Sequence, residues 1–293
     1  MSLEQGEQMH FKVLDGFSVD GLKKKNATRF KHKMVRECVA KSLSECSGGL
    51  TGEHVISQCV LDIFPEIKFR TPEGKRRPFG NSTTLNLLCE HHNNSFTAID
   101  DEMGFFFQSL INLSNASVRA LNFHHAERCA KEVTVSGYLI ERWFLKTLLY
   151  LQLFSSRIRG ESDFFGLFPL GSADVLRPVF TEEPIGQPFG LHLLPRTDNS
   201  LKAEFEIKYI PIEAINSRTV DHFRIPYSLE LQFFGFRLVG LFNITMLSNQ
   251  TFEASLKDWL GEDFDSLFTT RRPRELRAKN KKDKEFSTIY FSW

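Results

Sequence analysis

The pattern of apolar and polar positions predicts two helices in the first half of the chain. Downstream of Asn94 and Ser95, either of which can serve as an N-cap, apolar residues recur every three or four positions up to Phe106. Between Val135 and Arg159 the apolar positions form a broader face, which is typical of a helix packed in a core. These two segments carry the clearest helical periodicity in the sequence.

In the second half of the chain the apolar period changes to two. Residues 203–209 alternate between apolar and charged side chains, which is the pattern of a half-buried antiparallel strand. Residues 227–247 are typical of a long or bent strand pair that breaks near Gly235 or Gly240, and a final strand is expected at 287–291. The sequence therefore predicts an α+β fold with an antiparallel sheet in its C-terminal part.

Stretches rich in Gly and Pro separate these elements. Residues 65–82 and 160–190 are such stretches, and both are expected to be loops. The chain is expected to divide into a basic, weakly ordered segment at 1–37, a first domain at 38–132, and an α+β accessory or recognition domain at 133–293.

Length and composition limit the class of protein. With 293 residues, 41% of them hydrophobic and 29 of them Phe, the chain can bury a core built largely of aromatic rings. No apolar run reaches the roughly 18 residues that a membrane span needs, and no secretory signal is visible at the start. The five cysteines are odd in number and irregularly spaced. This spacing argues against a disulfide scaffold and for a reducing, cytoplasmic compartment.

The formal net charge of +1 conceals three basic windows. Window 21–37 has seven Lys and Arg against one acid, and window 66–78 has five against two. Window 271–285, which includes the basic segment 271–284, has eight against three. The rest of the chain is therefore acidic. A polyanion would meet local basic patches on such a surface, so the distribution favours nucleic acid as a partner.

The strongest chemical signal is an acidic residue beside a histidine, followed downstream by a Cys-x-x-His pair that leads into two asparagines. His54 can act as a general base near neutral pH. Glu53 and Asn93 offer the oxygen ligands that Mg²⁺ prefers. Neighbours on a strand point to opposite faces, so Glu53 and His54 can share one site only if the backbone bends, and Gly52 makes a bend easier. This combination favours hydrolysis of phosphodiester bonds.

Three segments of the chain resemble the HNH endonuclease family, whose fold is the ββα-metal finger. They are Glu53-His54-Val55-Ile56-Ser57, Leu85-Asn86-Leu87-Leu88-Cys89 and His92-Asn93-Asn94. The resemblance covers roughly residues 38–112 and implies that His54 is the general base. It implies that Asn86 fixes the loop and the orientation of the His54 ring. It also implies that Glu53 and Asn93 hold the catalytic Mg²⁺ or Mn²⁺.

The sequence departs from the family pattern at two places. Glu53 is longer than the commoner Asp, and a basic insertion lies between His54 and Asn86. The ligand at the start of the helix also stays open, because His92, Asn93 and Asn94 are all candidates.

The resemblance further implies a structural Zn²⁺, which many family members hold between two cysteine pairs. The second pair here would be Cys89 and His92, and the first would be Cys38 and Cys46 at wider spacing. Three thiolates and one imidazole are a suitable tetrahedral set. The alternative is that these four side chains only pack or cap.

Basic side chains in the insertion and near the C-terminus are expected to contact DNA phosphates, which positions a duplex without reading its sequence. They are Lys68, Arg70, Lys75, Arg76, Arg77, Arg271, Arg272 and Arg274. The C-terminal group could instead contact a partner protein or stay solvated.

The leading hypothesis is a metal-dependent HNH endonuclease acting on DNA, which nicks as a monomer and could break both strands as a dimer. The alternative is a catalytically inactive DNA-binding or regulatory protein with a purely structural finger. Compact HNH proteins with an accessory domain also resemble components of antiphage defence or mobile elements, which implies partner proteins from such a system.

Overall fold

The structure is a computed structural model in which helices and strands are mixed, as the α+β prediction requires. It describes residues 38–43, 45–63, 68–70, 76–78, 84–113, 132–159, 173–181, 183, 185–186, 188–195, 204–211, 224–233, 236–243, 249–262, 264–265, 271–279 and 286–293. The basic segment 1–37 lies outside the described residues.

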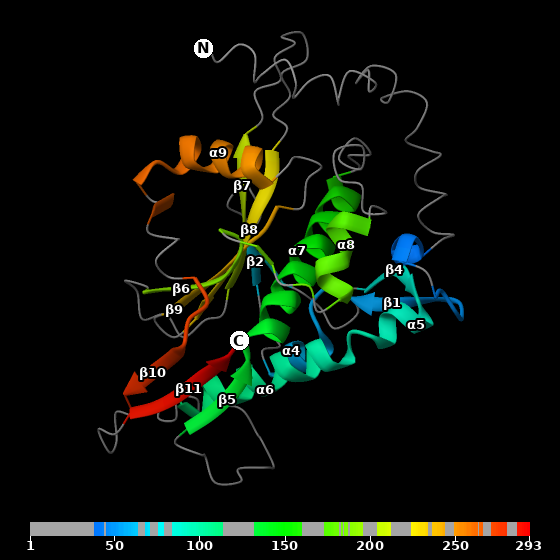
Figure 1. Cartoon of the computed structure of the whole chain (residues 1–293). Coiled ribbons are helices and arrows are strands. Elements are labelled where there is room, and N and C mark those ends of the chain that lie inside the picture. The colour runs from blue at the N-terminus through cyan, green and yellow to red at the C-terminus, as the bar shows by residue number, and fades with distance from the viewer. Residues whose placement is uncertain are drawn as a thin grey trace, which may run out of the picture.

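The first part of the described chain is built on a two-stranded antiparallel ladder (Figure 1). Its strands are β1 (Leu50–His54) and β4 (Thr84–Cys89), and we call it the β1–β4 ladder. A short 3-10 helix, η1 (Val39–Leu43), precedes β1. Helix α4 (Gln58–Ile63) follows β1, whereas α5 (Glu90–Asn94) and α6 (Thr97–Leu113) follow β4. Helix α6 confirms the helix expected after Asn94.

The largest sheet has six strands in the order β3-β2-β7-β8-β9-β6. The strands are β2 (Lys68–Arg70), β3 (Arg76–Pro78), β6 (Gly190–Pro195), β7 (Glu204–Pro211), β8 (Arg224–Phe233) and β9 (Phe236–Leu241). All neighbours are antiparallel except β2 and β7, which are parallel. The stretch 65–82, expected as a loop, therefore contains a hairpin that joins a sheet formed by the distant C-terminal part.

A third sheet joins the two ends of the second half of the chain. Its order is β10 (Glu275–Lys279), β11 (Phe286–Ser292) and β5 (Glu132–Ser136). Strand β11 confirms the final strand expected from the sequence. The basic segment 271–284 thus contributes one strand, β10, that pairs along its whole length with β11.

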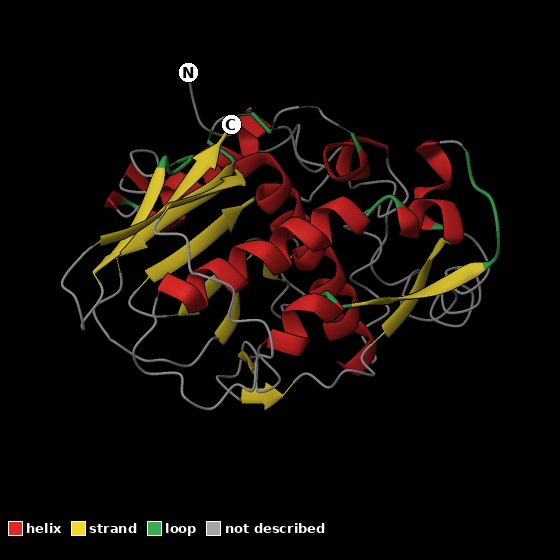
Figure 2. Ribbon diagram, turned by 90° about the horizontal axis from the view of Figure 1, so that it is seen from below, coloured by secondary structure: helices red, strands yellow, loops and turns green. Residues whose placement is uncertain are grey.

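Helix α7 (Gly137–Arg159) lies at the centre of the molecule, between the six-stranded sheet and the β1–β4 ladder (Figures 1 and 2). Its aromatic residues Trp143 and Phe144 are fully buried, and the Trp143 ring lies 5.8 Å from that of Phe205 in β7. On its other side, Trp143 lies 6.5 Å from Phe107 of α6. One hydrophobic core therefore runs across the domain boundary expected near residue 132.

Close packing against α7 also explains why the expected break at Gly240 is not there. Gly240 stays inside β9, and a Cβ at this position would come within 2.8 Å of Phe144 and 2.6 Å of Phe242. The break falls at the other expected place, because β8 ends at Phe233 and β9 begins at Phe236, on either side of Gly235. Gly240 is needed for a close approach between strand and helix rather than for a turn.

Two more helices complete the described chain, α8 (Ala173–Phe180) and α9 (Asn249–Leu260). Helix α8 lies within the stretch 160–190, which was expected to be a loop, and contains Pro178. Among the described helices, none combines the length and apolar character that a membrane crossing needs.

Candidate metal centre and neighbouring side chains

The β1–β4 ladder separates Glu53 and His54 onto opposite faces. In the ladder, His54 pairs with Thr84, Glu53 with Leu85, and Gly52 with Asn86. Directly opposed residues in an antiparallel pair share a face, and that face alternates along the strand. His54 therefore shares an outer face with Asn86, whereas Glu53 shares the inner face with Leu85.

Solvent exposure supports this assignment of faces. Thr84 and Asn86 are exposed and His54 is half-buried, whereas Glu53 and Leu85 are buried. Asn86 lies over the glycine opposite it, because its Oδ1 is 3.1 Å from where a Gly52 Cβ would stand. The backbone bend that would bring Glu53 and His54 together is thus not made.

On the inner face, Glu53 belongs to a buried group of polar side chains that we call the Lys146 network: Glu53, Ser57, Asp100, Trp143 and Lys146. Lys146, from α7, is only 1% exposed and its Nζ lies 2.5 Å from Oε1 of Glu53. The same Nζ donates to both carboxylate oxygens of Asp100, at 2.8 and 2.9 Å. One ammonium group therefore neutralises part of the charge of two carboxylates, of which Glu53 is buried and Asp100 is partly exposed.

Hydrogen bonds extend the network to the residues beside the ammonium group. Ser57 donates to Asp100 Oδ1 at 2.5 Å and accepts from Trp143 Nε1 at 2.7 Å. Burial raises the pKa of the Glu53 carboxyl, and the positive charge of Lys146 opposes that rise. Every polar atom named here has a partner of complementary character, which is the condition under which buried charge is tolerated.

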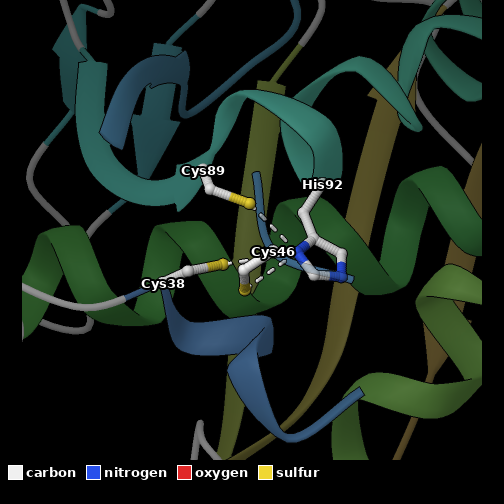
Figure 3. Close-up of side chains that lie close together, drawn as sticks. All are labelled: Cys38, Cys46, Cys89 and His92. Atoms are coloured by element: carbon white, nitrogen blue, oxygen red, sulfur yellow. Dashed lines mark hydrogen bonds between the residues drawn. The ribbon is translucent and has the colours of Figure 1, made fainter. Parts of the chain in front are cut away.

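Three cysteines and a histidine meet at one end of the β1–β4 ladder, and we call them the Cys/His cluster (Figure 3). Cys38 and Cys46 flank η1, Cys89 ends β4 as the N-cap of α5, and His92 lies within α5. Their four ligand atoms all lie within 4.8 Å of one another. Among the described residues this group can hold a metal ion, as the sequence predicted.

The distances within the cluster match those around a zinc ion. The sulfur atoms of Cys89, Cys38 and Cys46 lie 3.2, 3.5 and 3.6 Å from Nδ1 of His92. With Zn–S and Zn–N bonds of about 2.3 and 2.0 Å, a sulfur and a nitrogen on one tetrahedral zinc lie about 3.5 Å apart. The sulfur-to-nitrogen distances therefore fit a shared Zn²⁺ ion.

The protonation of the cluster suits a metal at His92 but not at Cys46. Burial and the neighbouring charge of His91 lower the pKa of His92, which keeps its imidazole neutral as a ligand must be. Desolvation and the adjacent Cys38 thiol raise the pKa of the exposed Cys46 to about 12, so a metal ion would have to displace its thiol proton. Burial opposes ionisation of Cys89 too, but hydrogen bonds from the backbone N–H groups of His92 and Ser47 lower its pKa overall.

The three candidates for the helix-start ligand differ in their surroundings. His92 directs Nδ1 at the three sulfur atoms of the cluster. Asn94 is exposed. Asn93 differs from the other two candidates because its Oδ1 is buried and accepts no hydrogen bond from the described residues. That atom fits a cation ligand, whereas the carboxylate of Glu53 is already engaged by Lys146.

The basic residues expected to contact DNA divide into two groups. Lys68 and Arg70 lie in β2, and Arg76 and Arg77 lie in β3, the edge strand of the six-stranded sheet. Lys75 lies outside the described residues.

Two of the three C-terminal arginines are used within the fold. Arg271 donates from Nε and Nη2 to the backbone carbonyls of Phe189 and Ile185, at 2.7 and 2.6 Å. The Arg272 guanidinium carbon lies 5.3 Å from the ring centroids of both Tyr138 and Trp293. Arg274 is exposed.

Sequence reasoning missed Lys146, Asp100 and Ser57. A signal for Lys146 exists, because it follows Trp143 by three residues and precedes Tyr150 by four, on a stripe that is otherwise apolar or aromatic. A charged residue at a buried position needs a partner of opposite charge, which would have directed attention to buried acids.

Comparison of the chain with protein-family models, curated proteins and solved structures yields no match.

Proposed function

We propose that this protein is a metal-dependent endonuclease of the HNH type that hydrolyses phosphodiester bonds in DNA. The observation that carries the proposal is the shared outer face of His54 and Asn86 on a two-stranded ladder whose end meets the Cys/His cluster. A histidine and an amide on one accessible face can position and deprotonate a water molecule next to a phosphate.

In this proposal His54 takes the proton from the attacking water, which a neutral imidazole does well near pH 7. Asn86 lies diagonal to His54 across the ladder and orients its ring. Asn93 offers its buried Oδ1 to the catalytic cation. Mg²⁺ or Mn²⁺, when bound, supplies charge neutralisation at the phosphate oxygens and at the leaving 3′-oxygen. The products would carry a 5′-phosphate and a 3′-hydroxyl.

The Cys/His cluster would hold Zn²⁺ as a structural ion. Its ligands come from both sides of η1, from the end of β4 and from α5. A zinc ion there would fasten the start of α5 to the ladder that carries His54. Because protein ligands would fill all four coordination positions, this ion would have no open position for a substrate or water and would be structural. It would stabilise the outer face of the ladder.

The direct test is plasmid nicking by the full-length protein with Mg²⁺ or Mn²⁺. We expect His54→Ala to lower the rate by about 10²- to 10⁴-fold, the usual contribution of a general base. Lys257→Ala is the control, because Lys257 is an exposed residue of α9 outside the proposed site and should leave the rate unchanged. Full activity of the His54→Ala protein would remove His54 from the mechanism.

One observation favours a second candidate function, a DNA-binding or regulatory protein without catalysis. The Glu53 carboxylate, which the family resemblance assigns to the metal, is paired with Lys146 instead. This candidate predicts salt-sensitive DNA binding and no cleavage with any divalent cation. The nicking assay therefore separates the two functions.

Contact with DNA phosphates can be tested at Arg274, which is exposed. If it contacts a phosphate, Arg274→Gln should reduce the salt dependence of binding by about one counterion, whereas an unchanged slope excludes the contact. A role in antiphage defence or in a mobile element is a further part of the proposal, and the identity of neighbouring genes would test it.

A further inference from the structure

The environment of Lys146 is that of a bound cation. Its Nζ contacts one oxygen of Glu53 and both oxygens of Asp100, at 2.5 to 2.9 Å. It also lies 4.5 Å from the centroid of the Phe96 ring, a position typical of a cation–π contact. Two carboxylates that converge on one point are the ligands that a hard divalent ion takes. Here that point is filled by an ammonium group of the chain itself.

The network has a second consequence, because Glu53 is the residue before His54. Lys146 holds the Glu53 side chain on the inner face of the ladder. Because successive side chains of a strand point to opposite faces, this places the side chain of His54 on the outer face. Asp100 comes from α6 and Lys146 from α7, so two helices anchor the end of β1. The anchor lies one residue from the proposed general base.

We propose that Lys146 is a positioning residue of the nuclease site: its ammonium group takes the cation position between Glu53 and Asp100, so Glu53 orients His54 and does not bind the catalytic metal. The orienting role rests on the proposed function, whereas the occupied cation position does not. The proposal assigns the catalytic ion to Asn93 and solvent, because Asn93 Oδ1 is buried and accepts no hydrogen bond within the described chain.

The test measures Mn²⁺ binding by electron paramagnetic resonance in the full-length protein, for wild type, Glu53→Gln, Lys146→Met and the double variant. If Lys146 fills a cation position, Lys146→Met should bind one more Mn²⁺ than wild type, because Glu53 and Asp100 are then free to take it. The double variant should lose this extra ion. Glu53→Gln alone should change the wild-type Mn²⁺ affinity by less than about threefold.

Two results would overturn the proposal. One is a loss of Mn²⁺ affinity of about tenfold or more in Glu53→Gln, which would make Glu53 a metal ligand. The other is a Lys146→Met protein that binds no additional ion. If Lys146→Met does not fold as purified, its refolding yield with and without Mn²⁺ decides the same point: recovery by Mn²⁺ supports the cation position, and no recovery rejects it.

Nicking kinetics on the same variants separate the positioning role from the proposed function. We expect Glu53→Gln and Lys146→Met to lower kcat, the double variant to be no slower than the slower single variant, and the Mn²⁺ concentration for half-maximal rate to stay constant. If Lys146 is only structural, Lys146→Met would keep the wild-type kcat at temperatures where it is folded. If wild type nicks no DNA, the endonuclease proposal fails while the Mn²⁺ measurement still decides the cation position.

Discussion

Two clusters of polar side chains lie beside the same short ladder, the Cys/His cluster at its end and the Lys146 network on its inner face, and they differ in where a cation would come from. The Cys/His cluster collects three thiols and an imidazole around one point and contains no cationic side chain. The Lys146 network collects two carboxylates around one point and supplies the cation from α7. The first would need an ion from solution, whereas the second is complete once the chain has folded. If the Cys/His cluster holds a metal, the dependence of stability on a metal should therefore be confined to that cluster.

The largest expected effect comes from removing the metal of the Cys/His cluster. Structural zinc contributes about 10–16 kcal/mol of binding energy in small zinc domains, which equals or exceeds the roughly 5–15 kcal/mol stability of a typical domain. We expect one zinc per chain by elemental analysis, and unfolding of the region 38–113 after chelation, as seen by hydrogen exchange.

A pair of cysteine variants sharpens this prediction. Cys89→Ala should lose the zinc and lower the melting temperature, because it removes one of the four ligands of the cluster. Cys59→Ala is the control, because its thiol lies outside the cluster and donates to the backbone carbonyl of Asp100. Equal zinc content in the two variants would mean that the cluster holds no metal.

The second largest effect is expected at Lys146. Lys146→Met leaves the buried carboxylate of Glu53 and the partly exposed carboxylate of Asp100 without their cation. Breaking a fully buried ion pair costs about 3–5 kcal/mol, and we expect a loss near the lower end of this range because solvent reaches Asp100. Urea unfolding at neutral pH measures the loss. Lys257→Met, at an exposed position of α9, is the control and should change the free energy of unfolding by less than about 0.5 kcal/mol.

Neutralising the whole network distinguishes charge from packing. The triple variant Glu53→Gln, Asp100→Asn, Lys146→Met removes all three charges and should recover most of the stability that Lys146→Met loses. If the triple variant is as unstable as the single variant, the contribution of Lys146 is packing of its aliphatic chain, and the contrast with the Cys/His cluster disappears.

Ser57 should have a smaller effect of the same kind. Ser57→Ala leaves the buried Nε1 of Trp143 without its acceptor and removes one hydrogen bond to Asp100, so we expect a loss of about 1–3 kcal/mol. Ser109→Ala is a matched control, because this buried hydroxyl donates only to the carbonyl of Phe105 within its own helix. A loss no greater than the control's would show that the network does not depend on Ser57.

The same contrast explains what the sequence could and could not predict. The ligands of the Cys/His cluster were predictable because the family resemblance named them and because cysteine and histidine have few alternative uses at such spacing. Helices α6 and α7 were predictable because a period of three to four residues is a local property.

The partner of Glu53 was not predictable in this way. The face to which the Glu53 side chain points follows from the alternation of side chains along a strand. Its partner Lys146, however, comes from the distant helix α7, so the contact depends on how α7 packs against the ladder. Strands β2 and β3 were missed for a related reason, since each has three residues and the pair joins a larger sheet only through the contact of β2 with the distant β7. Helix α8 was missed because Pro178 disfavours a helix locally, while its neighbour Val179 is buried in the core.

The buried carboxylate of Glu141 has a weaker cationic partner than Glu53 has, and its replacement should change stability least. Glu141 of α7 is 2% exposed and accepts from the backbone N–H of Leu191 at 3.0 Å, but its nearest described cation, Arg272 Nη2, is 3.9 Å away. Burial raises the pKa of Glu141 above that of the unfolded chain, and the hydrogen bond and Arg272 only partly oppose this. Between the two pKa values the folded protein holds more protons, so stability falls as pH rises.

Glu141→Gln keeps the acceptor and removes the charge, so the stability of this variant relative to wild type should rise with pH above about 4.5, by at most about 1.4 kcal/mol per pH unit. Urea unfolding of both proteins at several pH values measures the difference, and a constant difference would mean that Glu141 has the same pKa in the folded and the unfolded chain.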